Sequence, residues 1–401
     1  MDRIVVLGHK DHGKSTLIGQ LLIQTNSVFE SRIAEAKRAS ERLGKKFEPA
    51  FLLDSFSEER AYGLTLDTTR AELKYKGAAY EFIDVPGHKE LIQNMITGAS
   101  YADSAVLVVS AKAGEGFKDQ TRRHVFIANM LGIDFFIVAV NKLDAVGYSE
   151  QAFNKIKEEV ETYLKAVGIN NFVFVPVSAY TGENLVVLSK NMRWYKGKPL
   201  LEILHERLHK RSHDPEGQAV VLLNGTVEGE RESFIAGRVI SGKLSSKQHL
   251  LLLPENKKVR LLTMLVKGKR SGQAKKGENI AAKLSVDVKE PKGKVLASND
   301  ADISIGKRLH AKVLAVSSLS GKLQINFNGV LLGCKIGKIG RKTDILTGKP
   351  YTHGKIFAAE CELELSKPIA YSSFAKYPEL GRFILLSDGN FSGFGIVDNR
   401  N

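Results

Sequence analysis

A glycine- and lysine-containing loop near the N-terminus has the residue types and spacing that bind phosphate. It follows the apolar run Ile4–Leu7, precedes a helical pattern and reads Gly8-His9-Lys10-Asp11-His12-Gly13-Lys14-Ser15. The glycines allow backbone N–H groups to turn inward onto a β-phosphate, and the positive end of the following helix favours that negative charge. We expect Lys14 to reach the β- and γ-phosphates of a nucleotide and the Ser15 hydroxyl to bind Mg²⁺. The candidate nucleotide-binding residues of this loop are Gly8, Asp11, His12, Gly13, Lys14, Ser15 and Thr16.

A second group of candidate residues has the chemistry of the Mg²⁺ ion and the terminal phosphate. Asp84-Val85-Pro86-Gly87 follows a strand-like run, and His88 comes directly after it. An aspartate at a strand end can hold Mg²⁺ through water, and the Gly87 N–H can contact a γ-phosphate. We expect His88 to position the attacking water, with a simple helix-start residue as the alternative. The Thr65 hydroxyl can complete the Mg²⁺ shell once γ-phosphate is bound, with an ordinary β-branched strand residue as the alternative.

Two further motifs have the chemistry to select the base. Asn141-Lys142-Leu143-Asp144 follows the apolar run Phe135–Val140. A carboxylate at Asp144 can accept hydrogen bonds from the ring N–H and the exocyclic amine of guanine. Adenine presents no such pair of donors, so this motif selects GTP over ATP. Ser178-Ala179 follows a later strand, where a backbone N–H can meet the guanine oxygen.

The elements that must position these residues alternate between short apolar runs and longer helical patterns. Unbroken runs rich in Val, Ile and Phe suit parallel strands that are covered on both faces. They are Ile4–Leu7, Ala105–Ser110, Phe135–Val140 and Phe172–Val177. Helices are expected near 14–25, 88–98, 118–131 and 150–167, and the runs 71–76 and 79–84 flank Gly77 as a hairpin. This pattern predicts an α/β domain with a mostly parallel, doubly wound sheet, in which each motif lies at the carboxyl end of a strand.

The pattern of the chain changes after about residue 212. The segment His213–Gly217 is a plausible linker, and strand-like runs then recur every 8–12 residues between polar turns. Regular short strands with polar turns are typical of antiparallel β-barrels. Because the remaining 185 or so residues exceed one small barrel, we expect two barrels with a boundary near residue 303. The predicted domains are 1–212, 213–303 and 304–401.

Composition indicates a globular protein with an uneven distribution of charge. The chain has 401 residues, of which 43% are hydrophobic and 26% charged, with a net charge of +15. Residues 1–200 carry 26 basic and 24 acidic side chains, whereas residues 251–350 carry 21 and 7. The two cysteines, Cys334 and Cys361, suggest buried free thiols rather than a disulfide framework. No signal-peptide pattern or apolar run of ~18 residues is present, so we expect a cytoplasmic protein with no membrane partner.

These motifs together resemble the translation-factor class of GTPases, the elongation factor Tu/1-alpha-like proteins, over nearly the whole chain. The phosphate loop is similar to that class's Gly-His-x-Asp-His-Gly-Lys-Ser/Thr form, and Asp84–His88 to its Asp-x-Pro-Gly-His motif. Trp194–Gly197 and Leu200-Leu201 resemble the end of its GTPase domain, and Gly381-Arg382-Phe383 resembles its last barrel. The resemblance implies a P-loop GTPase domain followed by two β-barrels, with GTP or GDP and Mg²⁺ as cofactors.

Within that class, the sequence resembles one subfamily most. Gln120–His124 and Gly237–Gly242 look like the GTPase subunit of sulfate adenylyltransferase (ATP sulfurylase). Tyr62 and Asn390 stand where aminoacyl-tRNA carriers usually have arginine. The leading expectation is therefore a Mg²⁺-dependent GTPase that regulates an adenylyl-transferring catalytic subunit. The alternatives are an elongation-factor-like GTPase that binds aminoacyl-tRNA or the ribosome, and a GTP-gated binding module with negligible turnover.

Two features leave questions about the partner and the timing of hydrolysis. Lys10 occupies a position that this class usually fills with valine, and it either extends into solvent or places a second cation near the γ-phosphate. The basic residues of 251–350 either contact RNA or an acidic protein, or are solvated turns and edge strands. They include Lys267, Lys269, Arg270, Lys275, Lys276, Lys335, Lys338, Arg341 and Lys342.

Overall fold

The chain forms two compact units, which are described separately. The computed structural model describes residues 2–42, 47–53, 69–85, 102–211, 217–229, 232–317, 319, 321–351 and 356–398. The first unit comprises Met1–Ser212 together with Ile345–Lys349, and the second comprises His213–Asp344 and Pro350–Asn401. Within the described ranges, no helix is long and apolar enough to cross a membrane.

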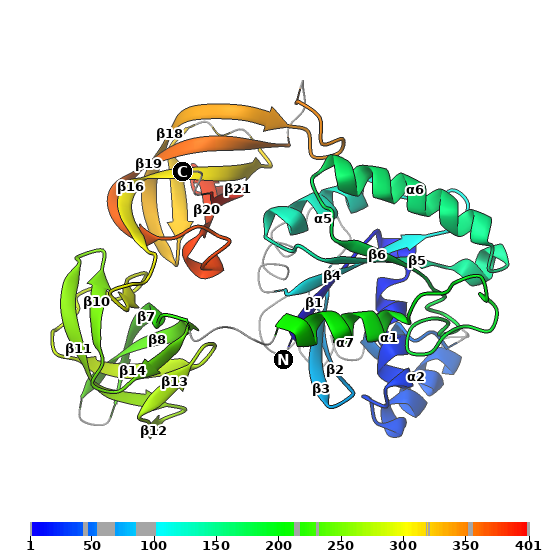
Figure 1. Cartoon of the computed structure of the whole chain (residues 1–401), viewed down its shortest axis with the longest axis horizontal. Helices are drawn as coiled ribbons and strands as arrows, with labels where there is room; N and C mark the ends of the chain where they lie inside the picture. Colours follow the sequence, from blue (N-terminus) through cyan, green and yellow to red (C-terminus); the bar gives the residue numbers. More distant parts are fainter. Residues whose placement is uncertain are drawn as a thin grey trace. The chain divides into compact units, whose positions relative to one another are not determined.

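The first unit contains a six-stranded, mostly parallel sheet with the order β2-β3-β1-β4-β5-β6 (Figure 1). The strands are β1 (Asp2–Leu7), β2 (Thr69–Tyr75), β3 (Ala78–Asp84), β4 (Ser104–Ser110), β5 (Phe136–Asn141) and β6 (Phe172–Pro176). Strand β2 pairs with β3 in an antiparallel hairpin, and the other pairings are parallel. Every residue of β4 and β5 is buried, as expected for strands with helices on both faces. The predicted strands and hairpin are confirmed.

Helices cover both faces of this sheet. They are α1 (Lys14–Gln24), α2 (Glu30–Arg42), α5 (Asp119–Met130), α6 (Glu150–Ala166) and α7 (Leu200–Arg211). Helices α1 and α7 share one apolar core with alternate residues of β1, β4 and β5, and Figure 1 shows α5 and α6 on the other face. The helices predicted at 14–25, 118–131 and 150–167 are confirmed, whereas the one predicted at 88–98 lies outside the described residues. Helix α7 was not predicted, although its leucines recur at helical spacing.

The second unit contains two antiparallel β structures. In the first, the strand order is β10-β15-β7-β8-β14-β11-β12, and β10 also pairs with β11, so the pairing runs round a ring. Two further strands, β9 and β13, form a separate ribbon. The strands are β7 (Val220–Glu228), β8 (Ser233–Ser241), β9 (Lys243–Ser245), β10 (His249–Leu253), β11 (Lys257–Val266), β12 (Lys269–Arg270), β13 (Gln273–Lys275), β14 (Asn279–Leu284) and β15 (Val295–Ala297).

The second structure is a closed barrel with the order β16-β19-β18-β17-β20-β21. Its strands are β16 (Ser304–Ala315), β17 (Leu323–Phe327), β18 (Val330–Thr343), β19 (Phe357–Tyr371), β20 (Arg382–Ser387) and β21 (Asn390–Val397). A small apolar cluster that includes Val220, Ala297, Ala370 and Tyr377 joins the two β structures in one unit. The predicted boundary near residue 303 falls between β15 and β16.

Both cysteines lie in the core of the closed barrel. Cys334 and Cys361 are free and buried, as expected from the sequence. Burial raises the pKa of both thiols to about 11, so they stay protonated and unreactive at neutral pH.

Candidate nucleotide-binding site

The phosphate-binding loop connects β1 to α1 through two glycines that other residues could not replace. Gly8 has a φ of 145°, and a Cβ there would lie 2.4 Å from the Val108 carbonyl oxygen. A short 3-10 turn, η1 (Lys10–His12), follows, and Gly13 then adopts a left-handed conformation with a φ of 84°. A Cβ on Gly13 would lie 2.6 Å from Asn141 Nδ2. The loop therefore packs closely against β4 and against the base-binding motif at the end of β5.

Lys14 is held over the loop that it follows. Lys14 is only 5% exposed, and its Nζ donates a hydrogen bond to the His9 carbonyl oxygen at 3.1 Å. Burial lowers the pKa of the Lys14 ammonium, while the negative charges of Asp84 and Asp11 oppose that shift. Among the described residues, this buried ammonium has one carbonyl acceptor, so it has two more hydrogens to donate to an incoming phosphate.

Two of the three predicted Mg²⁺ ligands, Ser15 and Asp84, meet at the carboxyl end of the sheet. Ser15 Oγ donates a hydrogen bond to Asp84 Oδ2 over 2.6 Å, although the two residues are 69 positions apart in the chain. Hydroxyl and carboxylate oxygens are the ligand types that Mg²⁺ prefers. The residues present therefore fit a Mg²⁺ ion at this point, with Asp84 binding directly or through water.

Asn141 connects the phosphate loop to the base-binding segment. Its Nδ2 donates to the His12 carbonyl oxygen at 2.8 Å, and its Oδ1 accepts from the Ala179 N–H at 2.8 Å. Next to it, Ser178 Oγ donates to Asp144 Oδ1 at 2.5 Å, which orients the carboxylate predicted to bind guanine. Because the Ala179 N–H is bonded to Asn141 here, its contact with the guanine oxygen stays a prediction.

Glu115 is a site residue that the sequence reasoning missed. Its carboxylate accepts a hydrogen bond from Lys142 Nζ at 2.7 Å and lies 3.5 Å from Lys112 Nζ. Burial would raise the pKa of Glu115, but hydrogen bonds from Lys142 and Ser110 and the nearby lysine charges lower it to about 2. Glu115 is therefore ionised and fixes Lys142, whose backbone is left-handed with a φ of 62°. No local sequence signal pairs these residues, which are 27 positions apart.

The histidines of the loop have different environments. His12 is fully buried, and its Nδ1 lies 3.2 Å from the Val108 carbonyl oxygen. Burial lowers its pKa to about 4, although the bond to Val108 opposes the shift, so the ring is neutral at pH 7. The His12 side chain thus supports the loop from within the core and does not line the cavity. His9 is partly exposed, and its Nδ1 lies 3.8 Å from Asp11 Oδ2.

A cavity of about 460 Å³ brings the phosphate loop and the base-binding residues together. Its lining includes the predicted residues Asp11, Gly13, Lys14, Ser15, Thr16, Asn141, Lys142, Asp144 and Ala179. It also includes residues that were not predicted to bind the nucleotide, namely Glu48, Ala50, Lys112, Ala145 and Tyr180. Gly8, His12, Asp84 and Ser178 are not part of this lining, although the last three form hydrogen bonds with lining residues. The predicted residues Thr65, Gly87 and His88 lie outside the described residues.

The loop after β1, the paired Ser15 and Asp84, and the Asn141–Asp144 motif define a P-loop domain of the guanine-nucleotide-binding kind. Residues 1–210 match the family model described as "Elongation factor Tu GTP binding domain", and residues 322–398 match "GTP-eEF1A C-terminal domain-like". The chain belongs to the elongation factor Tu/1-alpha-like family of GTPases, which confirms the resemblance to that class. Its fold is accordingly a P-loop GTPase domain followed by antiparallel β-barrel domains.

Individual relatives cover almost the whole chain. The elongation factor 1-alpha of Metallosphaera sedula is 32% identical, with 99% of this chain and 96% of that protein aligned. The elongation factor 1-alpha of Sulfurisphaera tokodaii is 33% identical, with 98% and 96% aligned. The crystal structure of a bacterial selenocysteine-specific elongation factor shares the fold, with a TM-score of 0.50, 23% identity, and 99% of this chain and 58% of that one covered. The resemblance to the sulfate adenylyltransferase subunit is not supported by these relatives.

Proposed function

We propose that this protein is a Mg²⁺-dependent translation-type GTPase that binds GTP and GDP, hydrolyses GTP, and contacts aminoacyl-tRNA or the ribosome. The observation that carries the nucleotide part is a single cavity with a phosphate end and a base end. Lys14 and Ser15 line its phosphate end, and Asp144 lines its base end. Family membership supports the same assignment.

In the proposed reaction, a water attacks the γ-phosphate in line with the bond that breaks. Lys14 stabilises the charge that develops on the phosphate oxygens, and the Asp144 carboxylate holds the guanine ring. Ser15, Asp84 and Thr65 would hold Mg²⁺, which when bound would supply positive charge to the phosphate oxygens. From the motifs, we assign His88 to orient the water and the Gly87 N–H to contact the γ-phosphate.

Replacing Asp144 tests the nucleotide assignment. We expect Asp144→Asn to weaken GTP binding by about 100-fold, because it removes two charge-assisted hydrogen bonds to guanine. The same variant should gain affinity for xanthosine triphosphate, whose C2 carbonyl can accept from the new amide. Equilibrium titration with both nucleotides measures the change, and Asp134→Asn, an exposed carboxylate outside the cavity, is the matched control. Unchanged GTP affinity in Asp144→Asn would contradict the base-binding role.

Hydrolysis is tested separately in a single-turnover assay with GTP. We expect His88→Ala to slow hydrolysis by about 100-fold or more, because the variant lacks the group assigned to orient the attacking water. Its affinity for GTP should change by no more than a few-fold. Negligible turnover in the unmodified protein would favour a GTP-gated binding module instead. The relatives named above are elongation factors, so they favour the translation-factor assignment over the sulfate adenylyltransferase subunit that the sequence alone favoured.

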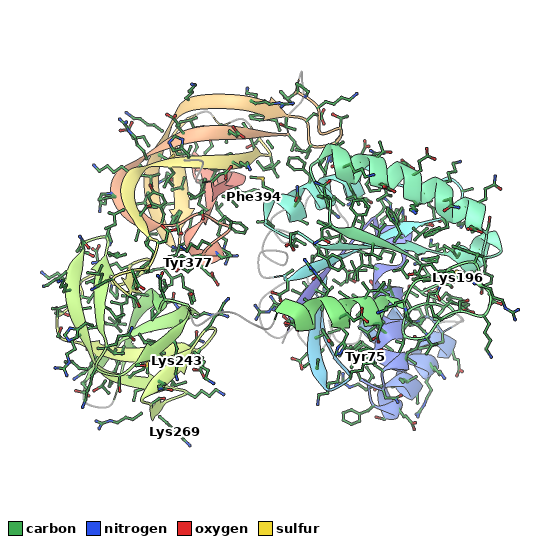
Figure 2. The ribbon with its side chains drawn as sticks, in the orientation of Figure 1. Tyr75, Lys196, Lys243, Lys269, Tyr377 and Phe394 are labelled. Atoms are coloured by element: carbon green, nitrogen blue, oxygen red, sulfur yellow. The ribbon has the colours of Figure 1, made fainter. Side chains whose placement is uncertain are left out.

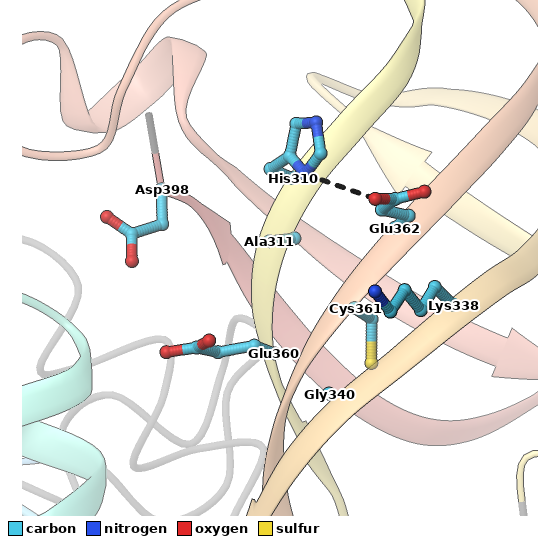
Figure 3. A pocket seen from close by; sticks show the side chains of 8 residues that line it. All are labelled: His310, Ala311, Lys338, Gly340, Glu360, Cys361, Glu362 and Asp398. Carbon is cyan, nitrogen blue, oxygen red and sulfur yellow. Dashed lines mark ion pairs between the residues drawn. The ribbon is translucent and has the colours of Figure 1, made fainter. Parts of the chain in front are cut away.

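Several basic residues of the closed barrel lie near carboxylates and are poor candidates for an RNA contact. Arg308 and Lys335 lie opposite Glu364 on the two strands that flank β19, and Lys312 pairs with Asp398 at 2.9 Å. Lys342 stacks over the Phe357 ring. Figure 3 shows three carboxylates, Glu360, Glu362 and Asp398, in the pocket that Lys338 and His310 also line. The charges of this face therefore largely compensate one another.

The first β structure of the second unit, formed by β7 to β15, has basic residues that no nearby carboxylate among the described residues neutralises. We call five of them the basic ribbon, which lies on β9, β12, β13 and the β11–β12 turn: Lys243, Lys267, Lys269, Arg270 and Lys275. Figure 2 labels Lys243 and Lys269. All five are exposed, and Lys243 lies directly opposite Lys275. Like charges directly opposite destabilise a pair of strands, and no described residue forms an ion pair with these five. An RNA backbone would supply the missing negative charge.

Two double variants of equal charge test the RNA contact. We expect Lys243→Gln with Lys275→Gln to weaken binding of aminoacyl-tRNA about tenfold at 0.1 M salt and to lower the salt slope by about 2. Lys335→Gln with Lys338→Gln should change the dissociation constant less than twofold, because carboxylates already face these lysines. Filter binding of the GTP-loaded protein over a salt series measures both. Equal effects of the two double variants, or no binding at low salt, would contradict the proposed RNA contact.

A further inference from the structure

Lys10 is the second lysine of the phosphate loop beside Lys14, and its role is not explained by the loop motif. It lies in the η1 turn between Gly8 and Gly13, its side chain is exposed, and it lines the same cavity as Lys14 and Ser15. Because Lys10 belongs to the same loop as Lys14 and Ser15, it lies on the wall of the phosphate end.

The position of the Lys14 ammonium shows how close Lys10 lies to that phosphate. Lys14 Nζ donates to the His9 carbonyl oxygen at 3.1 Å, and this carbonyl belongs to the peptide group that joins His9 to Lys10. The ammonium predicted to bind the β- and γ-phosphates therefore lies against the peptide group that directly precedes Lys10. The flexible four-carbon stem of a lysine at this position can bring a second ammonium to the same anion.

The charges around Lys10 also favour an anion. The described part of the chain offers Lys10 no ion pair, since the neighbouring Asp11 carboxylate lies beside His9 at 3.8 Å. The pKa of His9 reflects the same excess of positive charge. Burial lowers the pKa of His9, Asp11 opposes the shift, and Lys14 and Lys10 lower it further.

We propose that Lys10 contacts the terminal phosphate of the bound nucleotide as a second cation beside Lys14, so that the site prefers the triphosphate to the diphosphate. This inference rests on the proposed function, because it requires that the cavity bind guanine nucleotides. A triphosphate carries its additional negative charge at the terminal phosphate, so a second ammonium there stabilises GTP more than GDP.

Three variants with two nucleotides test this role. We expect Lys10→Gln to weaken binding of a non-hydrolysable GTP analogue about tenfold, the loss of one charge-assisted contact, while GDP affinity changes less than twofold. Lys10→Arg keeps the charge and should retain most of the affinity for the analogue. Lys74→Gln removes an equal charge from an exposed position on β2, outside the cavity, and should change neither constant. Fluorescent-nucleotide displacement in Mg²⁺-containing buffer measures each dissociation constant.

The outcomes separate this inference from the proposed function. If Lys10→Gln binds both nucleotides as the unmodified protein does, or loses affinity for both equally, the terminal-phosphate contact is overturned while guanine-nucleotide binding stands. If the unmodified protein binds neither nucleotide, the proposed function itself fails. A selective loss for the GTP analogue that Lys10→Arg restores supports the assignment to Lys10.

Discussion

His12 illustrates how one side chain in the phosphate loop has a structural role that its sequence context does not reveal. It lies between two residues of the nucleotide site, yet its ring is fully buried and bonded to the Val108 carbonyl of β4. Its carbonyl oxygen accepts from Asn141, so the residue connects the loop to two strands of the sheet. A charged imidazole in this position would lose its hydration without gaining a counter-charge.

The buried His12 ring predicts that acid destabilises the folded protein. Its pKa falls from an ordinary 6.5 to about 4, so between these values the unfolded chain binds a proton that the folded chain does not. The free energy of unfolding should therefore fall as pH is lowered from 6.5, by about 2 kcal/mol at pH 5 from this residue. Burial of His124 lowers its pKa to about 3 and acts in the same direction.

Denaturant unfolding at several pH values measures this dependence. His12→Asn keeps a donor for the Val108 carbonyl and removes the titrating group, so its pH dependence below 6.5 should be shallower than that of the unmodified protein. An equally steep dependence in His12→Asn would mean that other groups cause the acid sensitivity.

At the scale of elements, the carboxyl ends of the parallel strands bring the motifs together. Strands β1, β3 and β5 run in the same direction, so the residues that follow them emerge at one edge of the sheet. Gly13 then allows the chain to turn from the loop into α1 while the Asn141 amide lies against it. The site therefore depends on a close approach of two loops from separate strands.

Two glycines have nearly equal φ angles, but only one of them lies close to another loop. Comparing their alanine variants therefore distinguishes the cost of backbone strain from the cost of disturbing that close approach. Gly13 has a φ of 84° and a Cβ there would meet Asn141 Nδ2, whereas Gly77 in the β2–β3 turn has a φ of 80° and open space around it. We expect both alanine variants to lose about 1 kcal/mol of stability through the left-handed backbone. Gly13→Ala, but not Gly77→Ala, should lose more than about 1 kcal/mol of stability and should also bind nucleotide more weakly. Denaturation measures the stability, and nucleotide titration measures the affinity. Equal behaviour of the two variants would contradict the importance of the contact with Asn141.

At the scale of the whole molecule, the nucleotide site and the basic ribbon belong to different compact units. The ligand of the first unit should therefore stabilise that unit and leave the intrinsic stability of the second unchanged. Trp194, the one tryptophan of the chain, lies in the first unit and donates to the Tyr148 carbonyl at 3.0 Å. Its fluorescence consequently reports the unfolding of that unit.

Nucleotide should shift only the tryptophan-monitored transition. At 100 times its dissociation constant, a GTP analogue with Mg²⁺ should add about 2.7 kcal/mol to the stability of the first unit. Denaturation followed by tryptophan fluorescence should shift to higher denaturant, while the part of the circular-dichroism change that comes from the β-rich second unit should not. A common shift of both signals would show that the two units unfold together.

Local residue types and spacing were enough to predict the strands, the hairpin, the phosphate loop and the guanine motif, because each is contiguous in the chain. The sequence also pointed to the Ser15–Asp84 pair, since parallel strands end at one edge. Only the tertiary structure showed that Glu115 holds Lys142, that His12 is a core residue, and that Glu360, Glu362 and Glu364 lie among the basic residues of the closed barrel. The physical reason is that burial and charge pairing depend on strand register and long-range contact. A count of charges over residues 251–350 leaves out Glu360, Glu362 and Glu364, because these carboxylates lie on β19, which begins at Phe357 and pairs with β16 and β18.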